Sequence, residues 1–279
     1  MCIEGKTIQG RSNPQGRSEC TPGKSLMCKA VLHDLHNIII VDQSIPAVGY
    51  ISRNTPFGPE QDLVNRFLSI YLRKLHNNSF NYLVFLEPHI DSGYPDIVVV
   101  KYTNAKDCLW STDHFNLSRT HFKVLFEINR NKTISIKRLS QQTGIEQDKL
   151  IRIVNMLVKC NLAIERKRSV QRVPMKDYYC IKQIISFEAK ISKWSEAISQ
   201  ALINTRFATE SYVLMKGQES PEKMVSRCKE LGIGIYLMGD NLHKDLIAYK
   251  QNQPLAYTSY WINELVMRIE RNGVKDKCC

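Results

Sequence analysis

The spacing of apolar residues divides the chain into helical and extended segments. After Gly58 and Pro59, apolar residues recur every three or four positions, which predicts a helix that ends near residues 77–78. Residues 81–87 and 96–102 are short apolar runs separated by a turn, and they predict two strands. A weaker strand pattern covers 36–42; further strands are predicted at 178–191, 210–216 and 234–238, and further helices at 193–207, 221–231 and 258–271.

The pattern changes between residues 111 and 176. Three helix-sized segments occur there: the first follows Ser118, a residue typical of helix N-caps, and Gly144 makes the turn before the third. A basic run, residues 166–168, follows in extended sequence and returns through Arg172. The arrangement resembles a winged helix-turn-helix domain with the basic run in its wing. The outward face of the third helix carries Lys149, Arg152, Asn155, Met156 and Lys159.

These patterns predict an α/β domain that is interrupted by a mainly helical module. The expected organisation is a flexible N-terminal tail at 1–26, the first part of the core at 27–110, the inserted module at 111–176, and the second part of the core with a C-terminal helix at 177–279. Because short strands are not stable as separate halves, the two core parts are expected to share one sheet and one hydrophobic core.

Charge favours a polyanionic partner. The chain has 39 Lys and Arg against 27 Asp and Glu, a net charge of +12. Residues 111–176 contain 14 basic and 5 acidic residues, so about +9 of that charge belongs to the module. Phosphates attract such a surface and release counterions on binding, which favours nucleic acid. A surface charge that only keeps the protein in solution is the alternative.

Composition also narrows the cellular setting. The nine cysteines include no CxxC pair, and the first residues contain no apolar signal region. We therefore expect reduced thiols and a cytoplasmic protein. No apolar run is long enough to span a bilayer, so no membrane partner is expected.

Acidic and basic residues gather at the ends of two predicted strands. Asp96 begins the apolar run 96–102. In the second strand, side chains alternate, so Ser186, Glu188 and Lys190 share one face. An acid and a base two residues apart at the end of an apolar strand point into one site.

Pro95-Asp96 and Glu188-Ala189-Lys190 resemble the two halves of the PD-(D/E)xK motif. The resemblance to this nuclease superfamily implies a restriction-endonuclease-like mixed sheet flanked by helices, over residues 58–240 without the insertion. It also implies Mg²⁺, for which Mn²⁺ can substitute, held by Asp96, Glu188 and the backbone carbonyl of Ala189. The metal would polarise the phosphate, and Lys190 would orient water or offset negative charge.

Two further residues follow from the same resemblance. Glu60, in the first turn of the first core helix, would join the site as a fourth catalytic residue. Gln200, on the helix after the ExK half, matches a Gln of some branches; those branches have Tyr four residues later, where this chain has Asn204. The alternatives are a favourable acid at a helix N-terminus for Glu60 and simple solvent exposure for Gln200.

Taken together, the sequence predicts a Mg²⁺-dependent DNA endonuclease that grips duplex DNA through the module. Its DNA-binding residues would be Lys149, Arg152, Asn155, Lys159, Arg166, Lys167, Arg168 and Arg172. A restriction enzyme, a mobile-element nuclease and a defence nuclease all fit this prediction. A homodimer and a complex with an accessory protein are both compatible with it. The alternatives are a DNA-binding regulator or assembly protein that no longer cuts, a module that binds protein, an RNA substrate, and an ordinary surface Glu–Lys ion pair.

Overall fold

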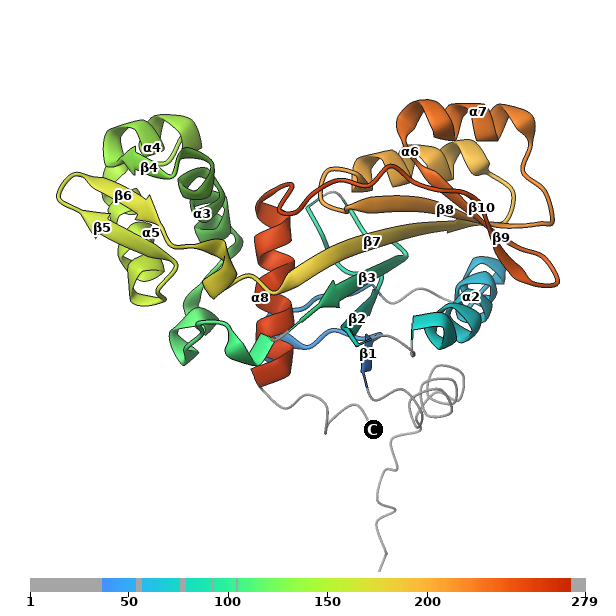
Figure 1. The fold of residues 1–279 in the computed structure, drawn as a ribbon, viewed down its shortest axis with the longest axis horizontal. Coiled ribbons are helices and arrows are strands. Elements are labelled where there is room, and N and C mark those ends of the chain that lie inside the picture. Colours follow the sequence, from blue (N-terminus) through green and yellow to red (C-terminus); the bar gives the residue numbers. More distant parts are fainter. Residues whose placement is uncertain (1–36, 54–56, 76–78, 92, 104, 272–279) are drawn as a thin grey trace, which may run out of the picture.

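The computed structural model describes residues 37–53, 57–75, 79–91, 93–103 and 105–271. The tail expected at 1–26 lies outside these residues, as do the last eight positions. Figure 1 shows a large sheet with helices on both faces and a smaller module beside it. An α/β class with a mixed sheet flanked by helices, expected from the sequence, is confirmed.

A seven-stranded mixed sheet forms the core, in the order β1-β2-β3-β7-β8-β9-β10. β1 and β2 are parallel, as are β7, β8 and β9, whereas β2–β3, β3–β7 and β9–β10 are antiparallel. The strands are β1 (Ile38–Val41), β2 (Asn81–Leu86), β3 (Ile97–Tyr102), β7 (Ile181–Lys190), β8 (Glu210–Lys216), β9 (Gly234–Met238) and β10 (Leu242–Leu246). β10 was not expected, because its sequence LHKDL has no clear alternation.

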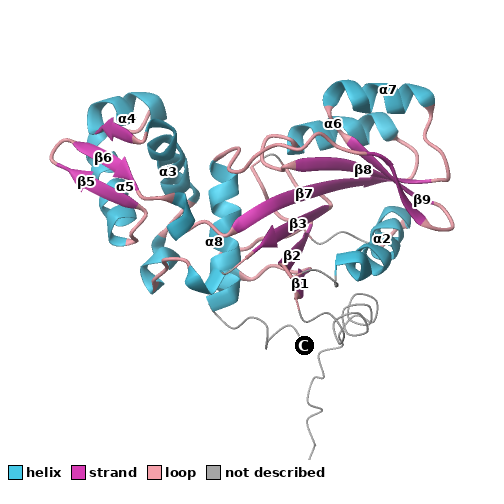
Figure 2. Cartoon of the chain, viewed as in Figure 1, coloured by secondary structure: helices cyan, strands magenta, loops and turns pink. Residues whose placement is uncertain are grey.

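Alternation along the strands sends apolar side chains to both faces. On one face, residues such as Val99 and Phe187 pack against α2 (Pro59–Leu75). On the other face, Val98 and Val100 pack against α8 (Tyr257–Arg271), while α6 (Trp194–Asn204) and α7 (Glu222–Leu231) cover β8 and β9. The helices therefore lie on both sides of the sheet (Figure 2).

The segment between β3 and β7 forms a separate group of three helices and a small antiparallel sheet, β4-β6-β5. Its elements are α3 (Arg119–Asn131), β4 (Thr133–Ser135), α4 (Ile136–Thr143), α5 (Gln147–Lys159), β5 (Ala163–Arg166) and β6 (Ser169–Arg172). Ser135 caps α4 by accepting a hydrogen bond from the backbone of Arg138, and Gly144 ends that helix in a left-handed conformation. These elements lie within residues 111–176, the segment that the sequence analysis calls the module.

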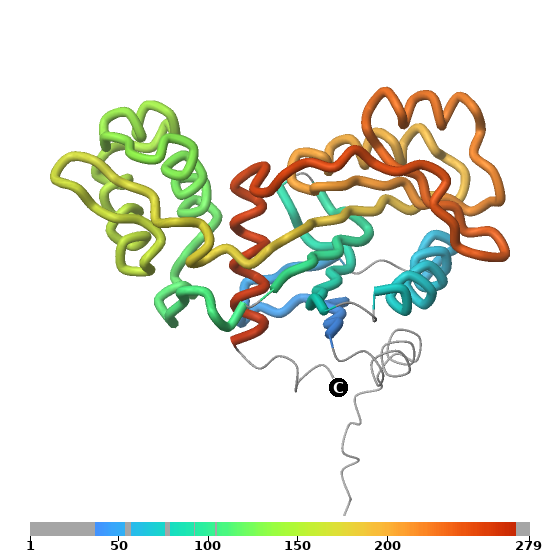
Figure 3. The backbone as a smooth tube through the Cα atoms, in the orientation of Figure 1, coloured from blue at the N-terminus to red at the C-terminus, as the bar shows by residue number. Residues whose placement is uncertain are grey.

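Helix α8 joins the module to the core. It stands between the start of β7 and α3 in Figures 1 and 3. Residues 258–269 of α8 are all buried, including Glu264 and Arg268. Phe122 of α3 packs on Trp261. A helix this completely buried must satisfy its polar side chains internally.

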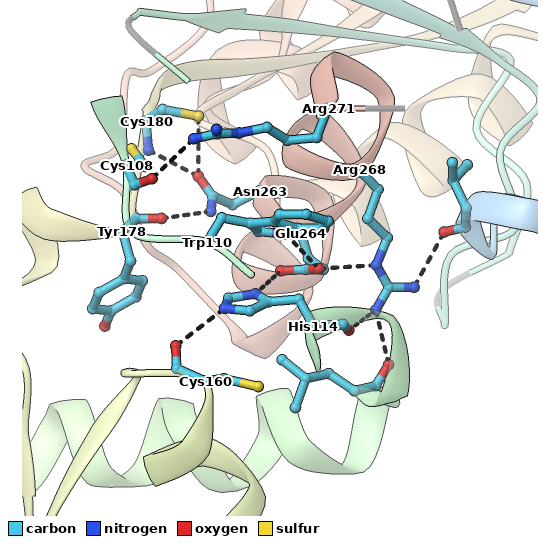
Figure 4. A network of polar contacts seen from close by, with 12 residues as sticks. Cys108, Trp110, His114, Cys160, Tyr178, Cys180, Asn263, Glu264, Arg268 and Arg271 are labelled. Atoms are coloured by element: carbon cyan, nitrogen blue, oxygen red, sulfur yellow. Dashed lines mark hydrogen bonds and ion pairs between the residues drawn. The ribbon is translucent and has the colours of Figure 1, made fainter. Parts of the chain in front are cut away.

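The polar side chains of α8 form a network with the segments that enter and leave the module (Figure 4). Glu264 accepts hydrogen bonds from Trp110 at 3.2 Å and from Nδ1 of His114 at 3.0 Å, and it pairs with Arg268 at 2.9 Å. Asn263 donates to the carbonyl of Tyr178 at 3.0 Å. These bonds fasten both ends of the insertion to one helix.

Candidate active site

The end of β7 carries the acid and the base of the site. Ile185, Phe187 and Ala189 belong to the core that packs on α2, so Ser186 and Glu188 face the opposite side. Glu188 is buried, with 3% of its surface exposed, and Lys190 ends the strand. Glu188 therefore lies on the face of the sheet that α6 and α8 cover.

Asp96 reaches the same place from β3. The antiparallel β3–β7 ladder ends with the pair Ile97 and Phe187, and continuing this register by one residue sets Asp96 opposite Glu188. The backbone N–H of Ala189 donates a hydrogen bond of 2.7 Å to Oδ2 of Asp96. The register of two strands that the module separates in sequence therefore brings the two carboxyl groups together.

Burial raises the proton affinity of both carboxyl groups. Burial, followed by the negative charge of Asp96, raises the pKa of Glu188 to about 8. Burial also raises the pKa of Asp96, although the Ala189 N–H and Lys190 oppose the shift. Buried carboxyl groups with raised pKa values mark a candidate functional site.

Lys190 connects this pair to α2. Its Nζ lies 3.1 Å from Oε2 of Glu60, a half-exposed residue in the first turn of the helix. Burial disfavours the ammonium form, but Glu60, Asp96 and Glu188 outweigh it and raise the pKa of Lys190. Lys190 therefore stays protonated at neutral pH. Glu60 is connected to the site through this ion pair with Lys190.

Helix α6 contributes Asn204 to the site. Its Nδ2 donates a hydrogen bond of 2.6 Å to Oε1 of Glu188, and the residue is buried. Gln200, one turn earlier, is exposed. Beside them, the Ser186 hydroxyl contacts Ser211, which donates to the carbonyl of Ala201. The helix that follows β7 thus orients Glu188 through Asn204. Gln200 is exposed to solvent, which is the alternative to a catalytic role that the sequence left open.

Glu87 and Arg53 also lie at this end of the sheet, and the sequence analysis did not find them. Nε of Arg53 donates a hydrogen bond of 3.0 Å to Oε2 of Glu87. The charge of Glu87 contributes to the raised pKa of Asp96, and the charge of Arg53 opposes the rise at Glu188. Glu87 follows directly on an apolar strand, like Asp96, and this common position is the signal that could have revealed it.

The oxygen donors fit a hard divalent cation. The hydrogen bonds described above use Oδ2 of Asp96 and Oε1 of Glu188, so each carboxyl group keeps its second oxygen for a ligand. Among the described residues, no three His, Cys, Asp or Glu side chains gather as a metal-binding group. Mg²⁺ commonly binds through one or two carboxylates and completes its shell with water. The backbone carbonyl of Ala189 stays a predicted ligand.

Comparison with known proteins does not decide the function. Comparison with protein-family models, curated proteins and solved structures finds no match. What the protein does must therefore be inferred from the chemistry of the site and of the module.

The module presents all eight predicted DNA-binding residues to solvent. Lys149, Arg152 and Asn155 are exposed on α5. The fourth predicted DNA-binding residue on that helix, Lys159, is exposed as well but forms an ion pair of 2.7 Å with Asp113. The β5–β6 hairpin exposes Arg166, Lys167, Arg168 and Arg172. Two basic surfaces, α5 and the hairpin, are therefore available to a partner.

The module and the carboxyl groups lie toward opposite ends of β7 (Figure 1). A strand rises about 3.3 Å per residue, so Glu188 is roughly 23 Å along β7 from Ile181.

No helix among the described residues has the length and apolar character needed to cross a membrane.

Proposed function

We propose that the protein is a Mg²⁺-dependent DNA endonuclease of the PD-(D/E)xK type, with a restriction-endonuclease-like core and an inserted winged helix-turn-helix. The observation that carries the proposal is the convergence of Asp96, Glu188 and Lys190 at one end of the sheet. Two carboxylates beside a protonated lysine match the requirements of phosphodiester hydrolysis. The raised pKa of Glu188 adds support, because a buried acid pair is costly unless it serves a ligand.

Asp96 and Glu188 would hold the Mg²⁺, which when bound supplies Lewis-acid stabilisation of charge on the phosphate. Ala189 and Asn204 fix the two carboxyl groups by hydrogen bonds, so the ligands do not have to be ordered during the reaction. Lys190 places a compact positive charge beside them, steered by Glu60. In the reaction, a water oxygen bonds to phosphorus, the bond to one ester oxygen breaks, and the proton lost by the water is balanced by one gained at the leaving oxygen.

The module would supply the grip on duplex DNA. Arg152 and Asn155 on α5 are proposed to face bases in the major groove, and the hairpin residues 166–168 to meet phosphates. Because the module and the carboxyl groups lie toward opposite ends of β7, bound DNA would extend along the molecule to reach both. Binding and cutting would then occur at separate positions on the duplex.

The test is incubation of supercoiled plasmid with the pure full-length chain, in Mg²⁺ and in EDTA. Nicked or linear product in Mg²⁺ only, absent with Glu188→Gln and Asp96→Asn, is the expected result. DNA binding without any cleavage in Mg²⁺ or Mn²⁺ would instead favour the non-cleaving regulator. A wild-type rate in well-folded Glu188→Gln would show that the cleavage arises elsewhere.

A further inference from the structure

Arg53 brings a second positive charge to the carboxyl pair, from a segment different from that of Lys190. It precedes α2 in the chain and lies in the loop that follows β1. The hydrogen bond to Glu87 raises the pKa of Arg53, and the charges of Asp96 and Glu188 raise it further. Its electrostatic partners thus include the two proposed ligands as well as Glu87.

Backbone hydrogen bonds hold Arg53 in line with the site. The N–H of Arg53 donates to the carbonyl of Glu87 at 3.0 Å, and the N–H of Glu87 donates to the carbonyl of Asp96 at 3.0 Å. Asp96 in turn lies opposite Glu188. The four residues therefore form a row across the end of the sheet, and the arginine occupies its outer position.

The arginine side chain is held at one end and open at the other. Glu87, whose side chain is 10% exposed, binds Nε, while the Arg53 side chain is 51% exposed. The guanidinium also lies 5.4 Å from the ring centre of Tyr94. Within the part of the chain that the structure describes, the terminal nitrogens of Arg53 have no hydrogen bond, so they are available to a ligand. A planar guanidinium is suited to phosphate because it can donate two parallel hydrogen bonds.

The backbone of Glu87, the residue that binds the side chain of Arg53, has an unusual conformation. Its φ is +46°, in the left-handed region that non-glycine residues seldom adopt. Strained residues of this kind persist where the surrounding structure holds them, and they concentrate at functional sites. A surface ion pair that merely closed the loop would need neither a buried acid nor this conformation.

We propose that Arg53 binds the scissile phosphate of the nucleic acid, on the side of the carboxyl pair away from Lys190, with Glu87 as its positioning residue. The inference rests on the proposed nuclease function. Arg53 donates to the non-bridging oxygens and balances the charge that builds on phosphorus as water attacks. Lys190, engaged by Glu60, and Arg53, engaged by Glu87, form a pair of cations around two acids.

The experiment measures single-turnover cleavage of a short DNA duplex by the full-length chain, with duplex binding measured separately in EDTA. The variants are Arg53→Ala, Arg53→Lys, Glu87→Gln and Glu188→Ala. Arg227→Ala is the matched control, because Arg227 on α7 is 56% exposed and is likewise paired with a glutamate, Glu230. Removing one charge-stabilising donor costs about 10²–10³ in rate, so Arg53→Ala is expected to lose that much while binding and thermal midpoint stay near those of Arg227→Ala.

Chemical rescue separates catalysis from support of the fold. Guanidinium at tens of millimolar should raise the Arg53→Ala rate several-fold above a NaCl control of equal ionic strength, and it should not rescue Glu188→Ala. Arg53→Lys should recover only part of the rate, since an ammonium lacks the planar fork. Glu87→Gln should slow cleavage without rescue, because its arginine is present but no longer oriented.

The outcomes distinguish this inference from the function on which it rests. Cleavage by Arg53→Ala at the wild-type rate, with Glu188→Ala inactive, overturns the role of Arg53 and leaves the nuclease standing. Loss of activity in Arg53→Ala that follows a fall in its thermal midpoint and does not respond to guanidinium also overturns it. A wild-type protein that does not cut overturns both.

Discussion

The replacement Arg268→Met tests the network that fastens the module to the core. Methionine keeps most of the length and apolar volume of the side chain but cannot donate a hydrogen bond. Arg268 is 4% exposed and pairs with Glu264 at 2.9 Å. It also donates to three carbonyl oxygens, those of Val48 at 3.2 Å, His114 at 2.5 Å and Leu117 at 3.1 Å. The replacement therefore removes four hydrogen bonds at once.

The size of the effect follows from what stays behind. Removing one partner of a buried ion pair costs about 3–5 kcal/mol, because the other charge is left uncompensated. Glu264 keeps the hydrogen bonds from Trp110 and His114, which reduces this term. Each unsatisfied buried carbonyl adds about 1–3 kcal/mol unless water or a small shift reaches it. We expect a total loss of about 5 kcal/mol, a large part of the roughly 5–15 kcal/mol that stabilises a folded domain.

Urea unfolding followed by far-UV circular dichroism measures this loss. Arg227→Met on α7 is the control, because its ion pair with Glu230 is exposed and is worth about 0–1 kcal/mol. The double variant Arg268→Met/Glu264→Gln should be more stable than Arg268→Met, since no unpaired charge is then buried. A midpoint for Arg268→Met equal to that of Arg227→Met would refute the reasoning, because it would mean that the buried network contributes nothing.

Three further predictions concern the site and the module. The pKa of Glu188 is about 8 in the folded protein, above its ordinary value of 4.5. The protonated group therefore contributes stability to the metal-free fold at low pH, and this contribution is lost as pH rises through about 8. Mg²⁺ must displace the same proton, so its affinity, measured by isothermal titration, should fall roughly tenfold per pH unit below about 8; equal affinity at pH 6 and pH 8.5 would contradict the assignment. Asn204→Ala removes the hydrogen bond that stabilises ionised Glu188, so it should shift the pH dependence of Mg²⁺ binding to higher pH, whereas Gln200→Ala, on the exposed side of α6, should leave it unchanged. Replacing Arg166, Lys167 and Arg168 with Ala should weaken binding to all DNA sequences and flatten its salt dependence, whereas Asn155→Ala should change preference among sequences; an unchanged salt slope in the triple variant would instead indicate that the module binds protein.

The sequence by itself determined the elements and the main chemical groups. Apolar spacing located helix α2 and strands β2, β3 and β7, because a buried face imposes a period of 3.6 or 2 on the residues that form it. The same alternation predicted Glu188 and Lys190 on one side of β7; the structure buries Glu188 on the face away from α2, whereas the side chain of Lys190, at the end of the strand, contacts Glu60 of α2. Strand β10 escaped this reasoning, since an edge strand with one partner, β9, needs no continuous apolar face.

Only the tertiary structure decided which distant groups meet. The register of β3 against β7 places Asp96 opposite Glu188 across the inserted module, and no local pattern encodes that pairing. Asn204 and Arg53 join the site through the packing of α6 and through the backbone hydrogen bonds that align the loop after β1 with the end of β2. Likewise, α8 has an ordinary helical pattern, yet its Glu264 and Arg268 are buried because the module and the core enclose the helix from both sides. Local periodicity reports one buried face, whereas the partners of a polar side chain depend on which other segments pack against it.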